Sequence, residues 1–140
     1  MMRCGMHTTF NKNIPSIKSE VRRTLLEALE FYNRLKRGGV AIPVDEFYFR
    51  LALDELLENA LSHGNRHDES KRILLHIAVS SGRVNISVRD DGPGFRPDLV
   101  ENPTGIPAIF RSSGRGLHLL RNIGDVTWND RGNEVMFRVG

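Results

Sequence analysis

The sequence LDELLENALSHG, residues 53–64, decides the fold of this chain because it combines an apolar helix with regularly spaced polar residues. It forms the second half of a helix predicted from about Pro43 to His63, with Gly64 just past the end. Apolar residues cover most of the circumference of this helix, so we expect it to be central rather than at the surface. Its polar residues therefore need an explanation.

Glu55 and Asn59 are four residues apart and share one stripe of this helix. A buried carboxylate is costly unless it is paired, so Glu55 is expected to meet a basic residue, to face a ligand, or to lie on an exposed face. At a ligand site, Glu55 has the chemistry of a general base and Asn59 that of a neutral oxygen ligand for Mg²⁺. The spacing alone leaves these alternatives open.

The second motif is Asp-Asp-Gly-Pro-Gly, residues 90–94, which follows an alternating strand predicted over 83–89. These residues are also typical of a simple turn. Two features favour a ligand site: a carboxylate ends a buried strand, and Gly92 and Gly94 allow a ligand to approach the backbone closely. The Asp90 carboxylate can accept a hydrogen bond from an exocyclic amine such as that of adenine.

The third motif is Ser-Gly-Arg-Gly-Leu, residues 113–117, at the start of a short helix predicted over 117–123. Glycines at a helix N-terminus expose backbone N–H groups, and the helix dipole adds positive potential, so a phosphate can bind there. A lone Gly-x-Gly can also be no more than the end of a loop. The sequence contains neither the dinucleotide fingerprint nor a P-loop.

The rest of the chain predicts an α+β fold. Strands and helices do not alternate as they do in a doubly wound sheet. The segment 91–115 has four prolines, four glycines and no clear period, and loops of this length are usually functional or disordered. Strands are predicted over 6–12, 72–79, 83–89, 126–129 and 134–139, and one more helix runs from about residue 15 to about residue 38.

Length and composition indicate one globular domain. A chain of 140 residues can bury roughly two thirds of its unfolded surface without disulfides. Hydrophobic residues make up 39% and charged residues 26%, which excludes a disordered chain, and no apolar run is long enough to cross a bilayer. His63 and His67 do not form the HExxH pattern, which argues against a zinc site.

Charge and cysteine content point to a cytoplasmic protein that does not bind nucleic acid. The net charge is +3, and the basic residues are spread along the chain rather than gathered in an arm. The single cysteine, Cys4, cannot form an internal disulfide, and the N-terminus lacks the apolar segment of a signal peptide.

In this order, the three motifs resemble the N, G1 and G2 boxes of the GHKL ATPase superfamily. Residues 53–64 are most similar to bacterial anti-sigma-factor serine kinases and related small ATP-binding regulators, and the resemblance spans roughly residues 10–139. It implies the Bergerat fold, a two-layer sandwich in which a mixed, mostly antiparallel sheet carries helices on one face. Residues 1–140 would form a single ATP-binding domain with a lid at about 93–113.

The resemblance also implies a role for each motif residue. Asn59 would coordinate Mg²⁺ together with the phosphates of ATP, Glu55 would be the general base, and Asp90 would receive the adenine amino group. Asn133 and Glu134 stand where many relatives have a threonine near the adenine, so no adenine contact is transferred to them. Gly92 and Gly94 would make room for the base and the lid, and Gly114, Arg115, Gly116 and Leu117 would form the phosphate-facing start of the last helix.

The function implied is that of an ATP-binding anti-sigma regulatory factor with protein serine/threonine kinase activity toward an anti-anti-sigma partner of the STAS type. A sigma factor is a second expected partner, and a homodimer is compatible with the resemblance; neither nucleic acid nor a membrane is expected. The alternative is a nucleotide-controlled binding module with little or no phosphoryl transfer.

Two further classes that share this nucleotide site are disfavoured. A sensor histidine kinase would need a phosphoacceptor hairpin, for which the roughly 40 residues ahead of the second helix leave no room. An ATP hydrolase of the topoisomerase or mismatch-repair type would need a transducer domain, which is not expected after Gly140.

Overall fold

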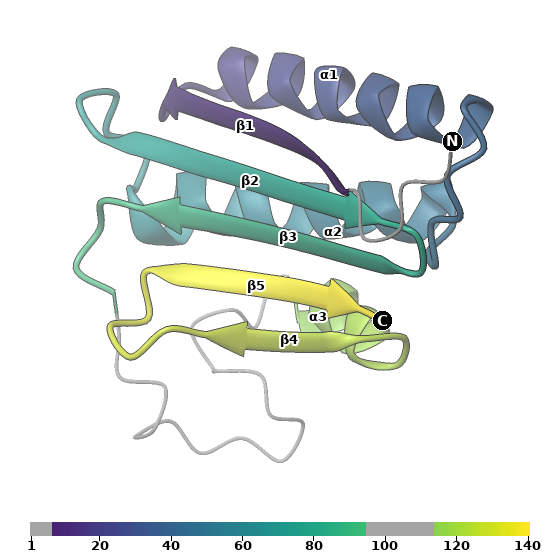
Figure 1. Cartoon of the computed structure of the whole chain (residues 1–140). Helices are drawn as coiled ribbons and strands as arrows, with labels where there is room; N and C mark the ends of the chain where they lie inside the picture. Colours follow the sequence, from purple (N-terminus) through teal and green to yellow (C-terminus); the bar gives the residue numbers. More distant parts are fainter. Residues whose placement is uncertain (1–6, 95–113) are drawn as a thin grey trace.

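The computed structural model describes residues 7–94 and 114–140, which fold into a sheet with helices packed on one face (Figure 1). This is the two-layer α+β architecture that the sequence predicts. In chain order the elements are β1 (His7–Pro15), α1 (Lys18–Arg37), α2 (Glu46–Asn59), a π-helical turn η1 (Ala60–Gly64), β2 (Arg72–Ser80), β3 (Arg83–Asp90), α3 (Gly114–Arg121), β4 (Asp125–Trp128) and β5 (Glu134–Val139).

The five strands are ordered β1-β2-β3-β5-β4. Every pairing among them is antiparallel, so the described part of the sheet is purely antiparallel rather than mixed. Strands β2 and β3 alternate buried and more exposed residues, and the register sets Ile77 opposite Ile86 and Ile86 opposite Phe137. These three side chains are fully buried, which places the core between the sheet and the helical layer.

Helix α2 lies at the centre of the helical layer, as its apolar circumference predicts. Phe49, Leu53 and Leu56 are completely buried, and each such side chain contributes roughly 1.5–3 kcal/mol relative to an exposed one. Helix α1 packs beside α2 through the rings of Tyr32 and Phe49, whose centroids are 4.6 Å apart. The Tyr32 hydroxyl is satisfied because it donates to the carbonyl oxygen of Val44 at 2.7 Å.

Several element ends differ from the predicted ones. Helix α2 begins after Asp45, whose side chain accepts a hydrogen bond from the Tyr48 backbone N–H, so the helix starts at this cap rather than at Pro43. Strand β1 continues to Pro15 because it pairs with β2 along its whole length. Helix α3 begins at Gly114, three residues before its predicted start.

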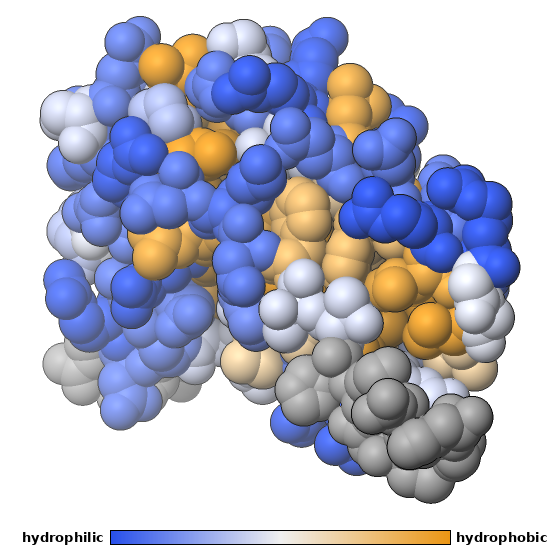
Figure 2. All heavy atoms as spheres, turned by 45° about the horizontal axis from the view of Figure 1, so that its top comes forward, coloured by the Kyte–Doolittle hydropathy of each residue, from blue (hydrophilic) through white to orange (hydrophobic). Residues whose placement is uncertain are grey.

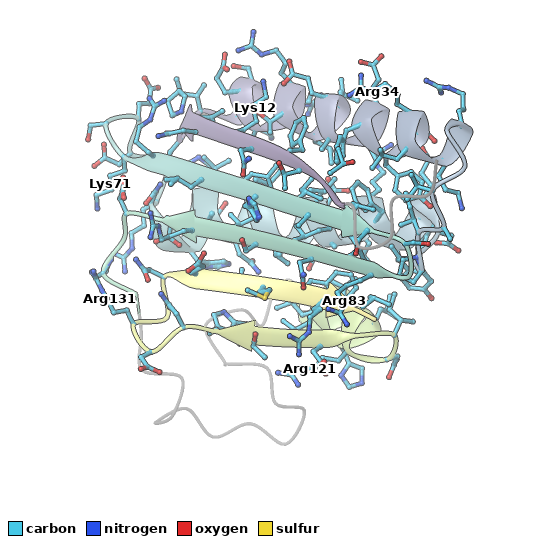
Figure 3. The ribbon with its side chains drawn as sticks, viewed as in Figure 1. Lys12, Arg34, Lys71, Arg83, Arg121 and Arg131 are labelled. Atoms are coloured by element: carbon cyan, nitrogen blue, oxygen red, sulfur yellow. The ribbon has the colours of Figure 1, made fainter. Side chains whose placement is uncertain are left out.

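The surface of the described residues is mixed in character. Hydrophilic side chains cover most of the face seen in Figure 2, with hydrophobic ones confined to smaller areas. Basic side chains are scattered around the molecule rather than gathered in one place, as Figure 3 shows for Lys12, Arg34, Lys71, Arg83, Arg121 and Arg131. None of the helices described is both long enough and apolar enough to cross a membrane.

Candidate functional site

The end of helix α2 is built to present Asn59. This residue is the last of the regular helix and only 4% exposed. The chain then widens into the π-helical turn η1, in which the Asn65 backbone N–H donates to the Ala60 carbonyl oxygen at 2.8 Å. Turns of this kind are rare and recur at functional sites. The predicted helix end at His63 therefore lies inside a π-helical turn.

Asp90 lies at the end of β3, where two glycine backbones pack against it. A Cβ on Gly64 would lie 2.2 Å from Asp90 Oδ2, and one on Gly92 would lie 2.1 Å from the Gly64 carbonyl oxygen. The Gly92 N–H donates to Asp90 Oδ1 at 2.8 Å. Burial raises the pKa of Asp90, and the hydrogen bond from Gly92 opposes this shift only in part. Because a Cβ would clash at both position 64 and position 92, only glycine fits at either of them.

Asn65 joins the two halves of this arrangement and was not among the predicted site residues. It is 1% exposed, and its Oδ1 accepts from the Asp91 backbone N–H at 2.8 Å. Its Nδ2 donates to the Arg72 carbonyl oxygen at 2.9 Å and to Ser16 Oγ at 2.6 Å. This one side chain ties the Asp90 turn to the end of α2 and to the start of α1. In the sequence, the only feature that indicates a role for Asn65 at the site is its position directly after Gly64.

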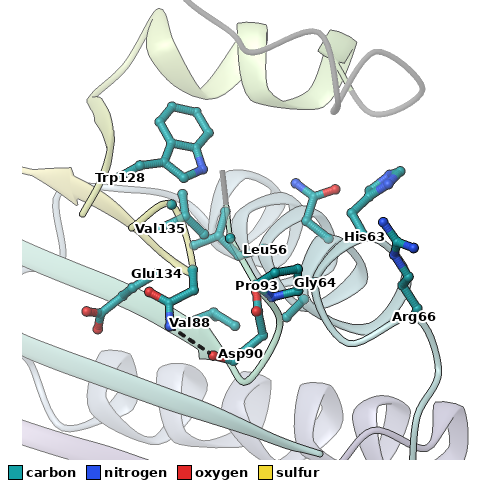
Figure 4. Close-up of a pocket in the computed structure, with 15 residues that line it drawn as sticks. Leu56, His63, Gly64, Arg66, Val88, Asp90, Pro93, Trp128, Glu134 and Val135 are labelled. Atoms are coloured by element: carbon teal, nitrogen blue, oxygen red, sulfur yellow. Dashed lines mark hydrogen bonds between the residues drawn. The ribbon is translucent and has the colours of Figure 1, made fainter. Parts of the chain in front are cut away.

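A pocket opens between η1, the end of β3 and the β4–β5 hairpin (Figure 4). In that view Trp128 and Val135 lie on one side of Asp90 and Gly64, and His63 and Arg66 lie on the other. The cavity is about 50 Å³, well below the roughly 300 Å³ of a typical ligand pocket, so a nucleotide has to widen it. Apolar walls beside one carboxylate suit a flat base that carries an amine.

Asn133, directly before β5, supports Asp90 and lies in the pocket wall. The Asp90 backbone N–H donates to the Asn133 carbonyl oxygen at 2.9 Å, and Asn133 Nδ2 donates to the Asp90 carbonyl oxygen at 3.3 Å (Figure 4). Asn133 Oδ1 in turn accepts from Asn129 Nδ2 at 2.7 Å. The Asn133 side-chain amide is therefore already hydrogen-bonded within the protein, where it helps to hold the Asp90 backbone in place.

Glu55 lies on the side of α2 that faces α3. A Cβ on Gly116 would lie 2.4 Å from both Oε1 and Cδ of Glu55, so the missing side chain lets α3 approach the carboxyl. Oε1 is buried and has no hydrogen-bond partner among the described residues. Burial, together with the nearby Asp54 and Glu58 carboxylates, raises the Glu55 pKa to about 7. A base with this pKa is matched to neutral pH.

The structure brings most of the predicted residues together. Asn59, Asp90 and Gly94 line the pocket, Gly92 packs beside Asp90, and Glu55 meets Gly116 one turn of α2 before Asn59. Leu117 is completely buried, so its side chain belongs to the core and only its backbone can face a ligand. Gly114 begins α3. The Arg115 side chain and most of the predicted lid, residues 95–113, lie outside the described residues.

The fold and this arrangement of motifs define a GHKL-type ATP-binding domain. The chain matches the family model for the histidine kinase-like ATPase domain over residues 18–139, and it belongs to that family. A comparison with curated proteins finds no match. Family membership supports an ATP-binding regulatory function, and it leaves the reaction and the partner to be argued from the site.

Proposed function

We propose that this protein is an anti-sigma regulatory factor that transfers the γ-phosphoryl group of ATP to a serine or threonine of a STAS-type anti-anti-sigma protein. The observation that carries the proposal is Glu55 Oε1, which is buried and has no hydrogen-bond partner among the described residues, in a side chain that lies one helical turn before Asn59. A general base is needed when the hydroxyl of a protein side chain or of water attacks the γ-phosphorus, whereas a module that only binds ATP needs none.

The pocket residues would bind the nucleotide. Asp90 would accept a hydrogen bond from the adenine amine, and the apolar walls around Val88 and Trp128 would pack against the base. The Asn59 side-chain oxygen suits Mg²⁺, which takes few protein ligands and keeps phosphate oxygens and waters as the others. When bound, Mg²⁺ would neutralise charge on the phosphates. The described residues fit this role because Asn59 lies in the pocket wall with Asp90.

In the proposed reaction, Glu55 accepts the proton of the acceptor hydroxyl while the hydroxyl oxygen forms a bond to the γ-phosphorus. The bond from that phosphorus to the β–γ bridging oxygen breaks, and ADP leaves with the electron pair. Glu55 Oε1 has no hydrogen-bond partner in the part of the chain that the structure describes, which supports this role because the acceptor hydroxyl would supply one. The proposal includes a sigma factor as a second partner, a possible second copy of the chain, and a cytoplasmic location.

The test is phosphoryl transfer from [γ-³²P]ATP, with Mg²⁺, to STAS-domain proteins encoded in the same genome. We expect labelling of serine or threonine by the wild type, none by Glu55→Gln, and ATP affinities within about threefold of each other. Glu30→Gln is the matched control, because Glu30 is an exposed residue of α1.

The outcomes separate the candidate functions. Equal labelling by Glu55→Gln would remove Glu55 as the base. Wild-type protein that binds ATP and the partner without any labelling would instead be a nucleotide-controlled binding module.

A further inference from the structure

A second, larger hollow lies between helices α1 and α2, away from the nucleotide pocket. Its volume is about 490 Å³, enough for several side chains. The floor is apolar and consists of buried Leu25, Leu57 and Leu61. Leu26 lies at the rim with 57% of its surface exposed, one of the few large apolar side chains that the described part of the protein leaves in solvent. We call this hollow the α1–α2 groove.

The two edges of the α1–α2 groove differ in charge. On the α2 edge, Asp54 lies 3.8 Å from Arg50, and Glu58 accepts a hydrogen bond from the Ser62 hydroxyl. On the α1 edge, Lys18 and Arg22 make no ion pair and no side-chain hydrogen bond with the residues that the structure describes. Three basic residues (Lys18, Arg22 and Arg50) and two acidic ones (Asp54 and Glu58) line the groove, so its charge surplus is positive. The two basic residues without an ion pair to a described residue, Lys18 and Arg22, are both on α1.

The α1–α2 groove and Glu55 are on opposite flanks of the same helix. Asp54, in the groove, directly precedes Glu55, whose carboxyl faces Gly116 of α3. An α-helix with its side chains is about 10–12 Å across. A protein bound in the groove therefore has to reach across the width of α2 alone to bring a hydroxyl to Glu55.

We propose that the α1–α2 groove docks the protein that carries the acceptor hydroxyl. This inference rests on the proposed kinase function and deepens it by naming the docking surface. The occupant is a segment whose apolar side chains fill the groove and whose acidic side chains face Lys18 and Arg22, because these two basic side chains have no acidic partner among the described residues. A second copy of this chain, which carries a net charge of +3, matches that edge less well than an acidic segment.

The test compares a groove variant with a control that removes the same charge from the same helix. The groove variant is Lys18→Ala/Arg22→Ala, with Leu26→Ser as a separate apolar variant. The control is Arg34→Ala/Arg37→Ala, which removes two exposed basic residues from the last turns of α1, outside the groove (Arg34 in Figure 3). Each is assayed with the STAS-domain protein for its dissociation constant in the presence of a non-hydrolysable ATP analogue, for KM and kcat, and for ATP affinity.

We expect both groove variants to raise the dissociation constant and KM for the STAS-domain protein at least tenfold. ATP affinity and kcat at saturating acceptor should stay within about twofold, as should every value for the control. Unchanged acceptor binding in the groove variants would overturn the docking surface. A change of oligomeric state in light scattering, without a change in acceptor affinity, would also overturn it, because the groove would then be a self-interface.

Failure of the proposed function gives a different result. Wild-type protein that binds the STAS-domain protein without labelling it would remove the kinase activity, and the dissociation constants would still decide whether the groove is the binding surface. Wild-type protein that neither binds nor labels any STAS-domain protein would overturn both proposals.

Discussion

The contact between Gly116 and Glu55 makes a quantitative prediction for Gly116→Ala. The added Cβ would lie 2.4 Å from Oε1 and Cδ of Glu55, whereas ordinary contacts of this kind begin at about 3.4 Å. The carboxyl therefore has to withdraw by about 1 Å. A displacement of about 1 Å at a reacting group typically costs about 100-fold in rate.

The same substitution should leave the fold intact. The clashing group is the far end of a flexible side chain, and no positive φ restricts position 116 to glycine. Alanine in a helix is favoured over glycine by about 0.5–1 kcal/mol, so the free energy of unfolding should stay equal or rise slightly. A large loss of activity without a loss of stability is the expected signature of a displaced base.

The assay is single-turnover phosphoryl transfer at saturating ATP, together with ATP affinity and denaturant unfolding. Gly38→Ala is the matched control, because its Cβ would meet the Arg34 carbonyl oxygen at an ordinary 3.4 Å. A rate within about threefold of the wild type would refute the placement of Glu55 at the reacting atoms. A loss confined to ATP affinity would show that Gly116 serves the nucleotide rather than Glu55.

Four further predictions concern the carboxyls and the buried amide. Asp90→Asn should weaken ATP binding at least tenfold, about 1.4 kcal/mol, by calorimetry, and unchanged affinity would exclude Asp90 from the site. Asn65→Ala breaks three hydrogen bonds of a side chain that is 1% exposed, so urea unfolding should show a loss of about 3 kcal/mol; a loss below about 1 kcal/mol would contradict this. Because the Glu55 pKa is raised from 4.5 to about 7, phosphoryl transfer should increase with pH through about 7. Stability should change in the opposite direction: because the folded pKa of Glu55 lies above the unfolded value of 4.5, its ionisation should lower wild-type stability as pH rises from about 4.5 to about 7, and Glu55→Gln should show a weaker decline.

Patterns along the chain predicted the parts of this protein that depend on local physics. The apolar circumference of residues 43–63 predicted a central helix, and Phe49, Leu53 and Leu56 are its buried face. Alternation in residues 83–89 predicted a strand with one face buried, which β3 confirms. The helix spacing likewise put Glu55 and Asn59 one turn apart.

Other features depend on contacts between distant segments and left no such pattern. The π-helical turn after Asn59 is held by the Asn65 N–H, and Asn65 is itself held by Ser16, Arg72 and Asp91. A local periodic pattern cannot predict a side chain that forms hydrogen bonds with three segments distant from it in the sequence. The start of α2 was predicted three residues early, at Pro43 rather than Glu46, because Pro43 and Asp45 both suit a helix start, and only the observed hydrogen bond from Tyr48 to Asp45 distinguishes them.

The glycines of the motifs acquire a second explanation from these contacts. From the sequence, Gly64 was expected only to follow the end of a helix and Gly116 to face the phosphates, yet Gly64 lies against the Asp90 carboxyl and Gly116 against that of Glu55. In each case a glycine backbone from another element excludes solvent from a carboxyl, and burial raises the pKa of both acids. In the protein without ligand, this close packing therefore leaves each carboxyl with few of the hydrogen-bond donors that would stabilise its charged form. An adenine amine at Asp90 and an acceptor hydroxyl at Glu55 would supply those hydrogen-bond partners. The packing that destabilises the charged carboxylates in the free protein would therefore favour binding of the two substrates.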